Sequence, residues 1–124
     1  MSEPRVLVVD DDRSIGRVVA SILSKRGYAV DVATTGSEAL QLVDAHRYDL
    51  AVLDYQMPEM DGVEVFRRAR EKQPDLMGIF LTAYADLNTV FPAIDAGIER
   101  VLAKPPKSSE LLPLVEELIG PNFT

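Results

Sequence analysis

Short apolar runs alternate along the chain with stretches that are apolar on one side only. Runs that are apolar throughout are typical of strands covered on both faces of a parallel sheet. Four such runs occur, at Val6–Val9, Leu50–Leu53, Ile79–Leu81 and Val101–Ala103. A fifth segment, Tyr28–Ala33, mixes apolar residues with Asp31, which favours a strand at the edge of the sheet. The pattern therefore predicts five strands.

Each predicted strand is followed by a segment with apolar residues at the helical period. The residues that would face the core are Ile15, Val18, Val19, Ile22 and Leu23, then Ala39, Leu40 and Val43, then Val63, Phe66 and Ala69, then Leu87, Val90, Phe91 and Ile94, and finally Leu111, Leu112, Val115, Leu118 and Ile119. Capping residues mark the ends of these segments. They are Asp12 and Gly27 around the first, Thr35 with Glu38 at the second, Asp86 and Gly97 around the fourth, and Ser108 or Ser109 before the fifth. Five helices are predicted.

Alternating strands and helices with short loops imply parallel strands joined by right-handed crossovers. We therefore expect an α/β fold, with a doubly wound five-stranded parallel sheet in the flavodoxin-like order 2-1-3-4-5. The 124 residues suit a single domain, which we place at residues 1–119. Residues 120–124 are then a C-terminal tail or the start of a linker.

The charge balance narrows the range of partners. The chain has 20 acidic and 13 basic side chains, a formal net charge of -7, which disfavours direct binding to nucleic acids or to an anionic membrane. No apolar run is long enough to span a membrane, and the N-terminal residues lack the apolar stretch of a signal peptide. The absence of cysteine excludes disulfides and thiolate metal sites. We expect a cytoplasmic protein whose partners are soluble proteins.

Four of the predicted strands end at polar residues of the kind that phosphoryl transfer needs. These are Asp10-Asp11-Asp12, Asp54, Thr82 and Lys104. In an open α/β sheet, ligands bind at the carboxyl ends of the strands, near the point where the strand order reverses. The acidic triplet and Asp54 should be neighbours there, across the gap between strands 1 and 3. Carboxylates suit Mg2+ or Mn2+, so the sequence predicts a metal-dependent phosphate-handling site.

Four motifs in this order carry a family resemblance. Leu7–Asp12, Leu53–Gly62, Leu81–Ala83 and Lys104-Pro105 together resemble the receiver domain of two-component response regulators, from about Arg5 to Ile119. The resemblance implies the following roles: Asp54 is the phosphoacceptor, Asp10 and Asp11 are the acidic metal-binding pair, Thr82 is the switch hydroxyl, and Lys104 contacts the phosphoryl group. It also implies a cis peptide at Lys104-Pro105, a metal ligand in the backbone carbonyl of Gln56, and a histidine kinase or phosphotransfer protein as phosphodonor.

The chemistry of such a site follows from its charges. A carboxylate that attacks phosphorus forms an acyl phosphate, but here it starts beside other carboxylates and meets an incoming dianion. A magnesium ion bound directly by Asp11 and Asp54, and mainly through water by Asp10, would cancel that charge, and Lys104 would neutralise phosphoryl oxygens. Without the metal, the clustered acids should raise one another's pKa. Metal binding should therefore stabilise the protein.

The resemblance also implies an output surface on the fourth helix, the fifth strand and the fifth helix. After phosphorylation this surface would switch and act on an output domain, a downstream protein or a second copy in a homodimer. Val101 stands where many receivers carry an aromatic residue, and Pro92 and Pro113 remove backbone donors from two helices of the surface. We therefore expect an atypical switch geometry. Tyr84, two residues after Thr82, is expected to shield the acyl phosphate from water.

Two other functions fit parts of this pattern. A phosphatase of the haloacid-dehalogenase type also uses an aspartate after strand 1, and Asp10 with Asp12 has the right spacing. However, Ser14 departs from the Thr or Val expected there, and the chain is short for that fold with its cap. A degenerate receiver would serve only as an interaction module, which the complete set of site residues argues against. We expect no enzyme activity beyond self-phosphorylation and autodephosphorylation.

Overall fold

The computed structural model describes residues 4–83 and 100–120. These ranges contain five strands, at Arg5–Val9 (β1), Ala29–Ala33 (β2), Leu50–Asp54 (β3), Met77–Thr82 (β4) and Arg100–Ala103 (β5). They also contain four helices, at Arg13–Lys25 (α1), Gly36–Ala45 (α2), Gly62–Lys72 (α3) and Ser108–Ile119 (α5). The predicted fourth helix, with Asp86, Pro92 and Gly97, lies outside the described residues, and so does Tyr84.

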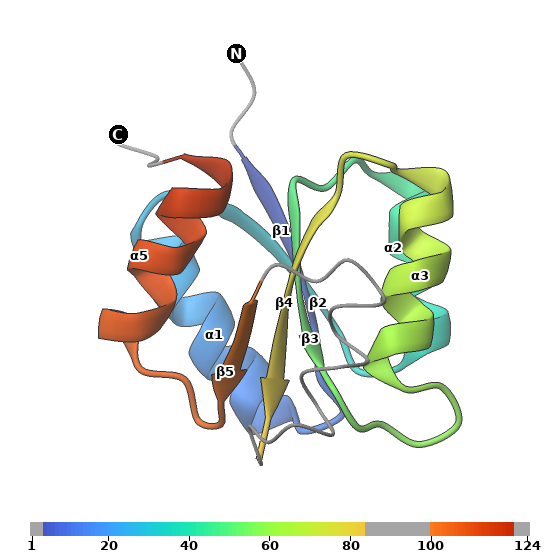
Figure 1. Cartoon of the computed structure of the whole chain (residues 1–124), viewed down its shortest axis with the longest axis horizontal. Helices are drawn as coiled ribbons and strands as arrows, with labels where there is room; N and C mark the ends of the chain where they lie inside the picture. Colours follow the sequence, from blue (N-terminus) through green and yellow to red (C-terminus); the bar gives the residue numbers. More distant parts are fainter. Residues whose placement is uncertain (1–3, 84–99, 121–124) are drawn as a thin grey trace.

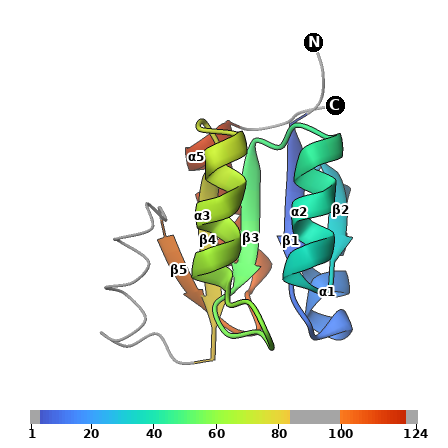
Figure 2. The same cartoon turned by 90° about the vertical axis from the view of Figure 1, so that its right-hand side faces the viewer.

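The strands form one parallel sheet in the order β2-β1-β3-β4-β5. Helices α1 and α5 cover one face of this sheet, and α2 and α3 cover the other (Figure 1). Figure 2 shows the strands side by side, with β2 and β5 outermost. The doubly wound, flavodoxin-like prediction is confirmed, including the edge position of β2. The strand order reverses between β1 and β3, which is where such sheets bind their ligands.

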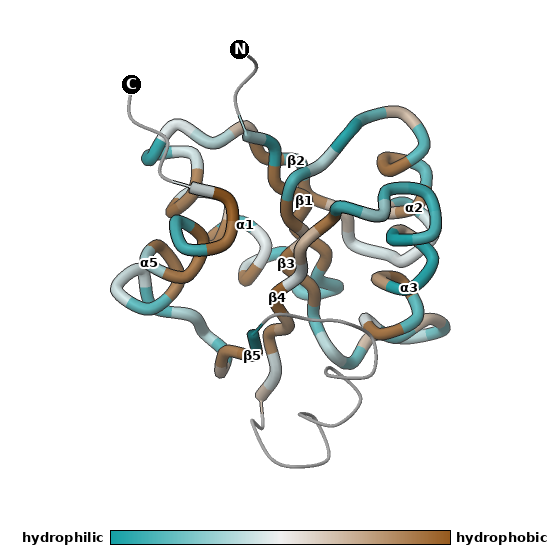
Figure 3. Tube along the Cα trace, turned by 45° about the horizontal axis from the view of Figure 1, so that its top comes forward, coloured by the Kyte–Doolittle hydropathy of each residue, from teal (hydrophilic) through white to brown (hydrophobic). Residues whose placement is uncertain are grey.

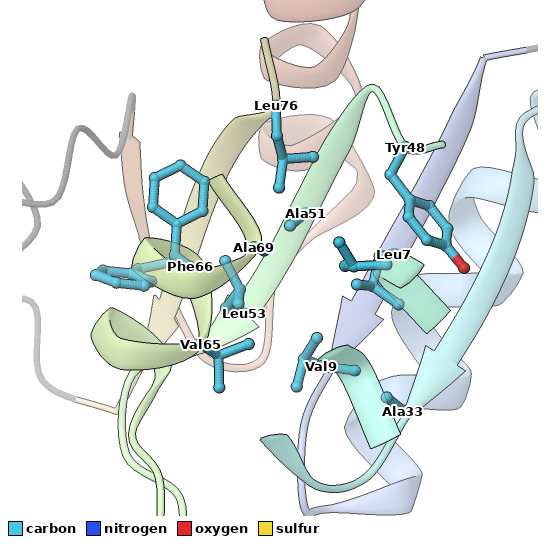
Figure 4. Packing of buried hydrophobic residues seen from close by; sticks show 13 residues of the cluster. Leu7, Val9, Ala33, Tyr48, Ala51, Leu53, Val65, Phe66, Ala69 and Leu76 are labelled. Atoms are coloured by element: carbon cyan, nitrogen blue, oxygen red, sulfur yellow. The ribbon is translucent and has the colours of Figure 1, made fainter. Parts of the chain in front are cut away.

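Each face of the sheet has its own apolar core. Leu7, Val9, Leu53 and Phe80 pack with Phe66 under α2 and α3 (Figure 4). Strand residues of opposite parity pack on the other face with Leu23 of α1 and Leu111 of α5. These strand residues include Val6, Val8, Val52, Ile79 and Leu81. The central strands are therefore buried on both faces, which explains why their sequences are apolar throughout and appear mostly brown in Figure 3.

The charged residue inside the edge strand β2 is held by a small polar network. Asp31 Oδ2 accepts a hydrogen bond from the Tyr48 hydroxyl at 2.7 Å and forms an ion pair with Arg5 Nη1 at 2.9 Å. The strand tolerates this charge because Asp31 lies on the α2 face of the sheet beside these two partners. Although burial opposes it, the hydrogen bond from Tyr48 and the Arg5 guanidinium lower the pKa of Asp31.

Three helices begin at a side-chain cap. Asp12 Oδ1 accepts the Ser14 N–H at 2.8 Å, Thr35 Oγ1 accepts the Glu38 N–H at 3.0 Å, and Asp61 Oδ1 accepts the Glu64 N–H at 2.9 Å. These bonds satisfy backbone donors that a helix leaves unpaired at its start. The Asp12 and Thr35 predictions are thereby confirmed. Gly27 follows the C-cap of α1 with a φ of 88°, a conformation that glycine adopts without strain.

The predicted cap of the last helix is wrong. Helix α5 begins at Ser108, and its N-cap is Lys107, which makes no side-chain capping hydrogen bond. The Lys107 carbonyl instead accepts the N–H groups of Glu110 and Leu111 at 3.0 and 2.9 Å. The first turn therefore closes on the backbone alone, and Ser108 and Ser109 are helical residues.

Candidate functional site

Asp10 follows β1 and is the most buried acid of the site. Its side chain is fully buried, and Oδ1 accepts the Asp12 N–H at 2.9 Å. Oδ2 lies 2.9 Å from Lys104 Nζ in an ion pair, but it has no partner with hydrogen-bond geometry among the described residues. Asp11, the next residue, is exposed. Asp12 turns away to cap α1.

Asp54 is the last residue of β3 and faces the same crevice. It is 5 % exposed, its Oδ1 accepts the Gln56 N–H at 3.2 Å, and its Oδ2 lies 3.0 Å from Lys104 Nζ. The ammonium of Lys104 therefore bridges Asp10 and Asp54, which lie on the adjacent strands β1 and β3. The backbone N–H of Gln56 donates to Asp54. That the Gln56 carbonyl binds a metal ion stays a prediction.

Lys104 and Thr82 enter the site from the next two strands. Thr82 ends β4 and is buried, one residue beyond Leu81, which pairs with Asp54. The Lys104 N–H donates to the Thr82 carbonyl at 2.9 Å, which continues the β4–β5 pairing up to the site. The Lys104-Pro105 peptide is cis, as expected. The four strand ends thus converge as the sequence predicts.

The three carboxylates fit a hard divalent cation. One oxygen from each of Asp10, Asp11 and Asp54 lies within 4.8 Å of the others. Mg2+ prefers such oxygen ligands and retains waters, so one exposed and two buried carboxylates suit it. The buried Asp10 Oδ2 lies 2.9 Å from the Lys104 ammonium and makes no hydrogen bond among the described residues, so it can accept a further positive charge.

The surroundings of Asp54 disfavour its ionised form. Burial, together with the neighbouring Asp10 and Asp11, raises the pKa of Asp54 to about 6, although Lys104 acts in the opposite direction. Burial disfavours the charged form of Lys104, but its two carboxylate partners outweigh this and raise its pKa. The expected effect of neighbouring acids is confirmed for the pKa of Asp54, and burial is the larger cause there.

The loop after Asp54 contains a feature that the sequence analysis missed. The Gly62 N–H donates to the Tyr55 carbonyl at 3.1 Å, and a Cβ added at Gly62 would lie 2.2 Å from the Asp54 carbonyl oxygen. Helix α3 therefore begins directly against the backbone of the candidate phosphoacceptor. The Asp61-Gly62 pair indicated a turn, but its sequence does not show which backbone approaches the glycine.

Glu59, in the same loop, adopts a φ of 69°. The Met60 N–H donates to the Pro58 carbonyl at 2.7 Å around it. A hydrogen bond between residues two apart with a positive central φ describes a γ-turn, an uncommon and strained conformation. The loop is thus tightly folded between Asp54 and α3.

Comparison with known proteins decides the family. A family model described as the response regulator receiver domain matches residues 6–116. The chain belongs to this family. The receiver domain is 41% identical over 115 residues to the response regulator MprA of Mycolicibacterium vanbaalenii, covering 93% of this chain and 50% of that protein. It spans about half the length of the curated relatives it matches.

Solved receiver structures share its fold. The chemotaxis protein CheY4 of Vibrio cholerae is 28% identical, with a TM-score of 0.90 over 95% of this chain and all of that one. The response regulator TrrA of Thermotoga maritima, solved in complex with Mg2+ and BeF, is 34% identical, with a TM-score of 0.83 over 94% of this chain and 99% of that one. The protein is therefore a receiver domain of a two-component response regulator. Members of this family use phosphoaspartate chemistry, and the chain has the acidic cluster that this chemistry needs. In the part of the chain that the structure describes, no helix has the length and apolarity to cross a membrane.

Proposed function

We propose that this receiver domain accepts its phosphoryl group on Asp54, from a histidine kinase or a phosphotransfer protein. The observation that carries the proposal is the placement of Asp54. It is a buried carboxylate at the switch point of the sheet, 3.0 Å from an ammonium and grouped with two further carboxylates. A carboxylate oxygen that attacks phosphorus forms an acyl phosphate while the bond from phosphorus to the donor's imidazole nitrogen breaks, and that nitrogen takes up a proton.

The residues around Asp54 prepare it for this step. Lys104 would lie against the equatorial oxygens of the arriving group, where positive charge stabilises phosphoryl transfer. Asp10, Asp11 and Asp54, with the backbone carbonyl of Gln56, would hold Mg2+ or Mn2+. Such an ion, when bound, offsets negative charge between the carboxylates and the phosphoryl oxygens. The reaction leaves one covalent group on the chain, so we propose a phosphoacceptor module without sustained enzymatic turnover.

Thr82 and β5 connect the site to the output surface in this proposal. The phosphoryl group would bring strong acceptor oxygens to the end of β4, and the Thr82 hydroxyl would donate a hydrogen bond to one of them. Because the Thr82 carbonyl accepts the Lys104 N–H, a shift at Thr82 reaches β5 directly. Val101 in β5 packs against the core under α2 and α3, and a valine there has no ring to reorient.

The target of the output surface is also a proposal. We infer an output domain or a downstream protein that contacts the predicted fourth helix, β5 and α5, with a homodimer through this surface as another form of output. The length of the MprA relatives, about twice the matched region, supports an attached output domain. We further propose that the protein acts in the cytoplasm, where its phosphodonor would be found.

The phosphatase alternative finds no support in the geometry. Asp10, its nucleophile, is fully buried, accepts the Asp12 N–H through Oδ1 and meets Lys104 through Oδ2. A nucleophile needs an oxygen that the substrate can reach, and Asp10 is 0 % exposed whereas Asp54 is 5 % exposed. The complete set of site residues likewise disfavours a degenerate receiver.

Labelling with a small phosphodonor tests the proposal. The protein is incubated with acetyl phosphate and magnesium, and intact mass with peptide mapping locates the adduct. We expect one phosphoryl group, on Asp54, and none after Asp54→Asn. Asp12→Asn is the matched control, because asparagine keeps the helix cap and should label normally. Labelling that persists in Asp54→Asn, or repeated turnover of a phosphomonoester, would overturn the assignment.

A further inference from the structure

Among residues 4–83 and 100–120, no strand pairs with the outer side of β2, which is an open sheet edge. In a parallel ladder, alternate residues direct both backbone groups to the same neighbouring strand. The Ala29 N–H donates to the Pro4 carbonyl and the Ala33 carbonyl accepts the Asp10 N–H, so these residues face β1. Val30 and Val32 therefore direct their N–H and C=O groups away from β1, along the outer edge seen in Figure 2. Such an edge is a ready template for another strand.

A hollow of about 450 Å³ lies beside this edge, between α1 and β2. Its lining consists of Arg13, Arg17, Ala20, Val32, Thr34 and Glu38. Val32 is 37% exposed, which makes it one of the two large apolar residues that are exposed in residues 4–83 and 100–120. Small residues bring α1 close to the strand here, since a Cβ added at Gly16 would lie 3.1 Å from Val32 Cγ1. The hollow is therefore a groove that is lined in part by apolar residues and lies beside the unpaired edge.

The groove carries uncompensated positive charge. Arg13 and Arg17 are exposed and one helical turn apart, and neither makes an ion pair within the described ranges. The carboxylate that shares the groove, Glu38, accepts the Thr34 N–H through Oε1 at 3.1 Å. Asp31 lies on the opposite face of the sheet, paired with Arg5. In a chain of net charge -7, two unpaired guanidinium groups beside a sheet edge favour an acidic partner.

The spacing of the two arginines matches a strand. Residues four apart on a helix are separated by about 6 Å along its axis, and alternate residues of a strand by about 6.6 Å. We propose that the β2 edge binds an extended acidic segment of a partner protein as an additional strand, with carboxylates at alternate positions paired to Arg13 and Arg17. Backbone hydrogen bonds to Val30 and Val32 supply affinity, and the arginines supply specificity.

The same charges disfavour a second copy of this chain as the occupant. If two β2 edges paired about a two-fold axis perpendicular to the sheet, α1 of each copy would lie on the same face. Arg13 and Arg17 of both copies would then lie on the same face of the joined sheet, and this concentration of like charge opposes association. An acidic strand from a different protein has no such penalty. The binding does not depend on phosphorylation of Asp54, so its test is separate from that of the proposed function.

The test uses the unphosphorylated chain and a short fluorescent peptide with glutamate at alternate positions and threonine or valine between them. Fluorescence anisotropy should show saturable binding, and the amide resonances of Val30 and Val32 should shift in the NMR spectrum. The double variant Arg13→Glu/Arg17→Glu should weaken binding at least about tenfold. Arg47→Glu, at an exposed arginine near the other end of the sheet, is the matched control and should change the affinity less than about twofold.

A second peptide separates strand addition from simple charge attraction. N-methylation at alternate residues removes backbone donors, so the methylated peptide should bind at least about tenfold more weakly than its parent. Equal binding of the two peptides would overturn the proposal, as would equal binding to the charge-reversed variant, or no binding at all. If circular dichroism shows that the charge-reversed variant is unfolded, Arg13→Gln/Arg17→Gln takes its place with the same expected direction. Concentration-dependent dimerisation through shifted Val30 and Val32 amides, without peptide binding, would assign the edge to self-association instead.

Discussion

At the scale of single residues, the site combines groups whose charges oppose one another. Asp10 and Asp54 are buried carboxylates within reach of one ammonium, and Asp11 adds a third acid at the surface. One lysine cannot neutralise three carboxylates. The metal-free protein therefore stores an electrostatic cost at its functional centre, which a cation or a proton can relieve.

Asp54→Asn should stabilise the metal-free protein near neutral pH, by roughly 1–3 kcal/mol. The folded-state pKa of Asp54 is about 6, raised by burial and by the other acids from an ordinary value of 3.8. The folded state therefore holds the proton more tightly than the unfolded state. The associated stability is fully present below about pH 4 and is lost as the pH rises through about 6.

Urea unfolding in the presence of a chelator checks this prediction. The difference in unfolding free energy between Asp54→Asn and wild type should be largest near pH 7.5 and should shrink toward about pH 4. If the variant were less stable than wild type across this range, the attraction of Asp54 to Lys104 would dominate its burial, contrary to our reading of the site.

At the scale of elements, the junction between β3 and α3 fixes the position of Asp54. The first residue of α3 rests on the Asp54 carbonyl, and the Asp61 side chain caps the helix two residues after the strained Glu59. Asp54 is thus held by the backbone of the helix that follows it as well as by its own strand.

Gly62→Ala should destabilise the protein by about 1–3 kcal/mol and slow labelling of Asp54. The added methyl would lie 2.2 Å from a backbone oxygen that cannot move without the strand. Gly36→Ala is a matched control, because its closest neighbours are side-chain atoms of Val65 and Met60, at 2.9 and 3.1 Å, and not backbone atoms. Thermal unfolding and acetyl phosphate labelling measure both effects. Equal losses in the two variants would show that the Asp54 carbonyl contact carries no special constraint.

The elements also show what a sequence can and cannot predict. Apolar runs that end in Asp10, Asp54, Thr82 and Lys104 were sufficient to predict the strands and the convergence of their ends, because parallel strands share one carboxyl edge. The close approach of Gly62 was missed, since sequence does not encode which distant backbone faces a glycine. The cap of α5 was wrong because side-chain preference does not reveal where a backbone turn closes.

At the scale of the whole molecule, the proposed cation site joins β1 to β3. Asp10 and Asp11 follow β1, and Asp54 ends β3. A cation that binds these three carboxylates only when they are assembled would stabilise the entire fold by mass action. Cation binding at the crevice can therefore be measured as a change in the free energy of unfolding of the whole domain.

Mg2+ at about one hundred times its dissociation constant should stabilise the protein by about 2.7 kcal/mol. The expected result is a higher midpoint of thermal unfolding than in a chelator. Asp11→Asn should lose most of this increase, because it removes an exposed ligand of the cluster. Asp12→Asn should retain it, since that side chain caps α1 instead. Identical midpoints of the wild-type protein with Mg2+ and with chelator would refute a cation site here.

The order of the strands has a further consequence during synthesis on the ribosome. The acidic residues and Asp54 leave the ribosome well before Lys104, which directly follows β5. A nascent chain that has emerged only as far as β4 possesses the nucleophile but not its ammonium partner. Competence to receive a signal therefore requires that β5 has emerged and paired with β4, so that the Lys104 ammonium reaches the crevice.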